Sequence, residues 1–74
     1  MFRRLILEAL EDRYNAQISE AEATLKIYLE KPVGIGEHPQ FANEIDKQLE
    51  IIGCALDKLK VINKYYPNED DIPF

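Results

Sequence analysis

Val33-Gly-Ile-Gly-Glu-His-Pro39 is the stretch that decides the fold, because it holds the only close pair of glycines and is preceded directly by Pro32. The residue before a proline is pushed out of the helical region, and glycine readily takes the left-handed conformation that commonly follows a helix. Pro39 suits the first position of a new helix, where its missing N–H costs nothing. We therefore predict a turn between two helices, with the turn residues Gly34, Gly36, His38 and Pro39.

The segments on either side of this turn are long, free of proline and rich in helix-forming residues. Apolar residues recur in each at steps of three and four, which is typical of a helix with one packing face. The apolar line of the first segment is Leu7, Leu10, Tyr14, Ile18, Ala21, Leu25 and Tyr28, and that of the second is Ile45, Leu49, Ile52, Leu56, Leu59, Ile62 and Tyr66. Two such lines joined by a short turn predict an all-α fold, an antiparallel two-helix hairpin.

The predicted helices cover about residues 3–31 and 39–66, with Pro32 ending the first and Pro67 ending the second. Folding the chain about the two glycines sets Leu25 near Ile45 and Ile18 near Ile52. Residues 1–66 then form the hairpin domain. Residues 67–74 combine three consecutive acids with two prolines, so we predict an acidic, non-helical C-terminal tail.

The charge balance disfavours two classes of partner. Nine basic and fourteen acidic residues give a formal charge of -5, which repels nucleic-acid phosphates and anionic membrane surfaces at long range. No apolar run is long enough to span a membrane. The single cysteine, Cys54, excludes an internal disulfide, and its apolar neighbours predict a small buried thiol in a reducing compartment. We therefore expect a cytoplasmic protein.

The residues that could carry chemistry are too few or too scattered for a site. Zinc needs about four ligands, whereas the chain offers one histidine in the turn and one cysteine several helical turns away. The same separation argues against a Cys-His catalytic pair. Gly34 and Gly36 lack the further glycine and lysine of a phosphate-binding loop. The sequence thus predicts no catalytic residue, no metal and no cofactor, and His38 is interpreted as a helix cap.

Apolar residues also extend beyond the two packing lines. On the first segment these are Phe2, Leu5, Ile6 and Ile27, and on the second we predict an interface made of Ile51, Ala55, Ile62 and Tyr65. Contiguous apolar surface of this kind marks contact sites between proteins. We therefore predict a homodimer in which two hairpins complete a four-helix bundle.

Three blocks of the chain carry a resemblance to a known family: residues 15–21 (NAQISEA), residues 33–39 (VGIGEHP) and residues 44–49 (EIDKQL). The chain resembles small helical-hairpin proteins of T4-type phages and their cyanobacterium-infecting relatives, among them those encoded beside the phage UvsW DNA helicase. The resemblance covers about residues 5–66. It implies an accessory place in phage recombination and repair inside the infected bacterial host cell, and it supplies no catalytic residue.

The sequence supports two candidate functions. The first is a non-enzymatic phage accessory protein that docks through its apolar faces onto itself or onto a helicase-related partner. The alternative is a direct binder of single-stranded nucleic acid that uses Arg3, Arg4 and Arg13 with Phe2 and Tyr14. The net negative charge, and basic residues scattered over both segments, favour the first.

A substitution in the turn tests the predicted helix end. If Gly34 has a positive φ, Gly34→Val should destabilise the hairpin by more than about 1 kcal/mol, because a β-branched side chain is strained in that region. Thermal unfolding followed by circular dichroism measures the effect. A melting curve that coincides with the wild-type curve would show that residue 34 has an ordinary backbone conformation.

Overall fold

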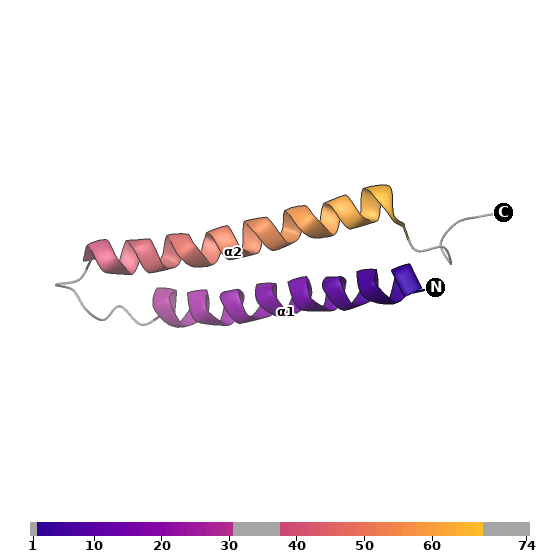
Figure 1. Ribbon diagram of the computed structural model, residues 1–74. Coiled ribbons are helices and arrows are strands. Elements are labelled where there is room, and N and C mark those ends of the chain that lie inside the picture. Colours follow the sequence, from indigo (N-terminus) through magenta and orange to yellow (C-terminus); the bar gives the residue numbers. More distant parts are fainter. Residues whose placement is uncertain (1, 31–37, 68–74) are drawn as a thin grey trace.

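Two long helices lie side by side and antiparallel in the computed structural model, which describes residues 2–30 and 38–67 (Figure 1). Helix α1 runs over Phe2–Glu30 and helix α2 over His38–Tyr65. Both helices are close to the predicted ranges, and α2 begins one residue earlier than expected. The predicted all-α helical hairpin is confirmed.

The packing face of α1 is the predicted one. Ala21 is buried with 1% of its surface exposed, and the other members of the predicted line are half-buried. The steps of three and four along this line average near 3.5 residues, which keeps one stripe facing a neighbouring helix along its whole length. The sequence pattern was sufficient here because no competing apolar stripe runs along the middle of α1.

The packing face of α2 differs from the predicted line. Ile45, Ile52, Leu59 and Ile62 are half-buried or buried as predicted, but Leu49, Leu56 and Tyr66 are exposed. The residues turned toward α1 are Phe41, Ile45, Gln48, Ile52, Ala55, Leu59 and Ile62. The observed line alternates steps of four and three without interruption. The predicted line has two successive steps of three, from Leu56 through Leu59 to Ile62. Up to Leu59, however, it alternates in the same way as the observed line, so spacing alone does not decide between Leu49 and Gln48 or between Leu56 and Ala55.

Small side chains set the separation of the helices in the middle of the hairpin. Ala21 of α1 and Ala55 of α2 are each 1% exposed, which makes them the most buried residues in the part of the chain that the structure describes. A methyl group fills little space, so the facing backbone can come close enough to exclude water. Half-buried Gln48 and Thr24 add polar atoms beside Ala21.

Aromatic and basic side chains join the helices at both ends of the hairpin. Near the turn, the rings of Tyr28 and Phe41 meet edge to face with centroids 5.4 Å apart, a favoured aromatic geometry. At the other end, Arg4 Nη1 donates a hydrogen bond of 3.4 Å to the Tyr66 carbonyl oxygen. Both contacts fit the predicted register in which Leu25 lies near Ile45.

Gly53 lies in the interior of α2, where no feature of the hairpin requires a glycine. A Cβ atom placed there would meet nothing within 4 Å, and the residue is exposed within a regular helix. Glycine in a helix interior costs about 0.5 to 1 kcal/mol relative to alanine. Gly53→Ala should therefore raise the free energy of unfolding by about that amount. Urea unfolding at a protein concentration at which both proteins are monomeric measures the change, and a destabilised variant under that condition would contradict the open surroundings of Gly53.

Candidate interaction surface

The most distinctive property of the hairpin is the amount of apolar side chain that it leaves in water. Large apolar residues at least two-fifths exposed occur on both helices: Phe2, Leu5, Ile6, Ile27, Leu29, Leu49, Ile51, Leu56, Val61, Tyr65 and Tyr66. On α1 they stand at the two ends, whereas on α2 they continue through the middle. Two helices packed on each other bury one stripe per helix, so these side chains lie outside the seam.

The structure separates the four residues of the predicted interface. Ala55 and Ile62 are buried, at 1% and 7% exposure, and lie on the face of α2 that packs on α1, so they cannot form an outward stripe. This part of the prediction is wrong, because the seam of α2 runs through Ala55 rather than Leu56. Ile51 and Tyr65 are exposed as expected.

The predicted turn residues fall partly outside the described residues. Gly34 and Gly36 lie there, so the prediction about the backbone of Gly34 remains a sequence-based one. His38 and Pro39 are the first two residues of α2, which agrees with the expected start of the second helix.

Two residues of the alternative nucleic-acid site, Arg4 and Tyr14, already have partners within the hairpin. Arg4 is engaged within the hairpin: its Nε lies 3.7 Å from Glu8 Oε2, and its Nη2 lies 4.0 Å from Glu11 Oε2. The Nε–Glu8 distance is too long for a hydrogen bond, and this buried nitrogen has no hydrogen-bond partner. Tyr14 is half-buried, with the Lys58 ammonium 5.2 Å from its ring centroid. Arg4 and Tyr14 are thus occupied in holding the two helices together.

A shallow groove crosses the seam near the middle of the hairpin. It is lined by Gln17, Glu20, Ala21, Thr24, Gln48 and Ile51, and it is open to solvent. The Thr24 hydroxyl donates a hydrogen bond of 3.0 Å to the Glu20 carbonyl oxygen within its own helix. An open groove with few converging polar groups does not enclose a small molecule, because such sites bury most of the ligand.

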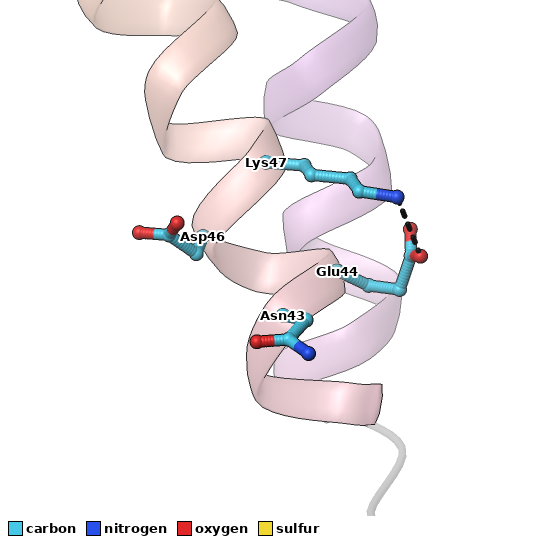
Figure 2. Close-up of a pocket in the computed structure, with 4 residues that line it drawn as sticks. All are labelled: Asn43, Glu44, Asp46 and Lys47. Carbon is cyan, nitrogen blue, oxygen red and sulfur yellow. Dashed lines mark hydrogen bonds and ion pairs between the residues drawn. The ribbon is translucent and has the colours of Figure 1, made fainter. Parts of the chain in front are cut away.

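A second hollow lies on the surface of α2 alone. Figure 2 shows its four lining residues, Asn43, Glu44, Asp46 and Lys47. Lys47 Nζ lies 3.3 Å from Glu44 Oε2 in an exposed ion pair, a kind of contact worth little to stability. Asp46 points away from this pair (Figure 2). The hollow is therefore ordinary helix surface. Of its two carboxylates, Glu44 is paired with Lys47, and Asp46 forms no ion pair with any residue that the structure describes.

Cys54 is exposed, so the prediction of a buried thiol is wrong. Its neighbours in the sequence are apolar, but helical periodicity turns residue 54 outward and residue 55 inward. Within residues 2–30 and 38–67, no three side chains of His, Cys, Asp or Glu come close enough together to hold a metal ion. In the same part of the chain, neither helix combines the length and the apolar character needed to cross a membrane.

Comparison of the chain with protein-family models, with curated proteins and with solved structures gives no match. On the surface of the hairpin, sequence reasoning missed the outward position of Leu49 and Leu56. The spacing gave no signal against them, because Ile45, Leu49, Ile52, Leu56 and Leu59 also follow one another in alternating steps of four and three.

Proposed function

We propose that this protein is a non-enzymatic accessory protein that acts by contact between its helices and those of another protein chain. The observation that carries the proposal is the set of exposed large apolar side chains along α2, which includes Leu49, Leu56 and Val61. Burial of one such side chain is worth about 1.5 to 3 kcal/mol, so leaving several in water forfeits stability that a small hairpin needs.

Direct binding of nucleic acid is less well supported. Of the residues in that alternative, Arg4 contacts Glu8 and Glu11, and Tyr14 contacts Lys58. The net charge of -5 opposes the approach of phosphates. We therefore favour binding to another protein chain over binding to nucleic acid.

The resemblance of the turn to phage proteins encoded beside the UvsW helicase supplies one candidate for the other chain. We propose a helicase-related phage protein as the binding partner, with a role in recombination and repair and a place in the cytoplasm of the infected host. The support for this finer proposal is the sequence resemblance in residues 15–49 together with the exposed apolar surface.

Sedimentation velocity of the purified chain, alone and mixed with a phage UvsW-type helicase, tests the proposal. We expect the 8.6 kDa chain either to sediment on its own as a heavier species or to co-sediment with the helicase in the mixture. The complex should persist as salt is added, because apolar contacts are not screened, whereas nucleic-acid binding falls steeply with salt.

A chain that sediments at 8.6 kDa on its own and separately from the helicase in the mixture would contradict the proposal. A low-salt gel-shift titration with a single-stranded oligonucleotide serves as the companion measurement. Retention of the oligonucleotide by a monomeric chain, lost as salt rises, would establish the alternative function instead.

A further inference from the structure

We propose that α2 docks onto α2 of a second copy of this chain, antiparallel, with the two helices crossing at Gly53. The contact surface is the stripe Leu49, Gly53 and Leu56, together with the flanking charges Asp46 and Lys60. The inference rests on the proposed function and names both the partner and the surface. It replaces the interface predicted from the sequence, of which Ala55 and Ile62 are buried inside the hairpin.

The apolar part of the stripe lies outside the seam between the two helices. Leu49 is 53% exposed and Leu56 is 48% exposed, and they lie four residues before and three residues after Gly53. Residues at these spacings share one side of a helix. On α1 the exposed large apolar residues stand only near Ile6 and Ile27 at its two ends. The middle of the hairpin therefore offers a helix-sized apolar contact on α2 and not on α1.

Gly53 supplies the second observation. It weakens the helix, its backbone conformation is helical, and the space around its absent side chain is empty. Nothing within the hairpin thus requires a glycine at this position. A missing side chain between two exposed leucines lets another backbone approach closely, and a helix that crosses at this point would place the leucines of both chains around the crossing.

The charges beside the stripe indicate a second copy in antiparallel orientation. Asp46 lies seven residues before Gly53 and Lys60 seven residues after it, so each is two helical turns, about 10 Å, from the crossing point. A twofold axis through Gly53 brings Asp46 of one chain opposite Lys60 of the other, and the pair occurs twice. Parallel docking would instead place like charges together.

Both charges are available for such pairs. Neither Asp46 nor Lys60 forms an ion pair with any residue that the structure describes. Asp46 points away from the Glu44–Lys47 pair (Figure 2). Under the twofold axis, Gly53 faces Gly53 and each Asp46 faces a Lys60, which is the self-complementary arrangement that a symmetric dimer requires.

Sedimentation equilibrium of the full chain over micromolar to millimolar concentrations tests the inference. We expect a monomer–dimer equilibrium that Gly53→Ala weakens about tenfold or more, because an added methyl group separates the crossing helices. The same substitution should raise the thermal stability of the monomer, so a weakened dimer cannot be ascribed to misfolding. A dimer dissociation constant that Gly53→Ala leaves unchanged would overturn the inference.

Charge reversal provides the matched controls. Asp46→Lys and Lys60→Asp should each weaken the dimer several-fold, and the double variant should restore it, because the swapped charges again face each other. Asp12→Lys on α1 makes the same change in net charge as Asp46→Lys, but outside the stripe, and should not weaken the dimer. Failure of the double variant to recover the dimer would overturn the antiparallel arrangement.

The outcome of this test is separable from that of the proposed function. A wild-type chain that is monomeric at every concentration, yet forms a complex with the helicase, would overturn docking of a second copy and leave the proposed function standing. A dimer that responds to Gly53→Ala as expected supports both.

Discussion

Ala21→Asp should unfold most of the hairpin at neutral pH. Ala21 is 1% exposed and packs against α2, and its neighbours one turn away on α1 are Gln17, Ile18, Thr24 and Leu25, none of which is a cation. An unpaired carboxylate at such a site loses its hydration without gaining a counterion. We expect destabilisation by more than about 3 kcal/mol, the scale seen when a buried charge is left uncompensated.

Ala23→Asp is the matched control, because it makes the same change two residues along the same helix at an exposed position. It should lower the free energy of unfolding by no more than about 0.7 kcal/mol, because aspartate has a lower helix propensity than alanine. Urea unfolding followed by far-ultraviolet circular dichroism, at one protein concentration for all variants, measures both. Similar losses from the two variants would mean that Ala21 does not face α2.

Ile62→Ala should destabilise the hairpin by about 2 to 4 kcal/mol. Ile62 is 7% exposed and is the most buried large side chain in the described part of the chain. Truncation removes three carbon atoms from the contact between the two helices, at the end of the hairpin opposite the turn. It leaves a cavity that two helices can only partly close. Since a domain of this size has only a few kcal/mol of stability, a large unfolded fraction is expected at ambient temperature.

Ile27→Ala deletes the same atoms from an exposed position of α1 and should cost less than about 1 kcal/mol. Thermal and urea unfolding of both variants at matched concentration provide the comparison. A result in which Ile27→Ala is the more damaging change would show that the inward and outward faces are assigned the wrong way round.

Local sequence signals were sufficient for the helices and their antiparallel pairing. Pro32, Pro39 and Pro67 restrict the backbone at their own positions, and residues 2–30 contain no helix breaker. A short connection between two amphipathic helices favours antiparallel packing, because the second helix must run back along the first. The contact between Tyr28 and Phe41 and that between Arg4 and Tyr66 fit the register obtained by folding the chain about its glycines.

The face that α2 turns toward its partner was decided only in the folded hairpin. Ile45, Ile52 and Leu59 belong to two overlapping stripes, one completed by Leu49 and Leu56 and the other by Gln48 and Ala55. Hydrophobicity alone favours the first stripe, since leucine is more apolar than glutamine or alanine. In the hairpin Ala55 is buried and Gln48 half-buried, whereas Leu49 and Leu56 are exposed, so the second stripe is the one that packs on α1. Both stripes alternate steps of four and three, so the choice depends on how the side chains fill the space between the helices, and Ala55 takes up less of that space than Leu56 would. Leu49 and Leu56 are left in water for that reason, and the surface available to another chain is a consequence of how the two helices pack.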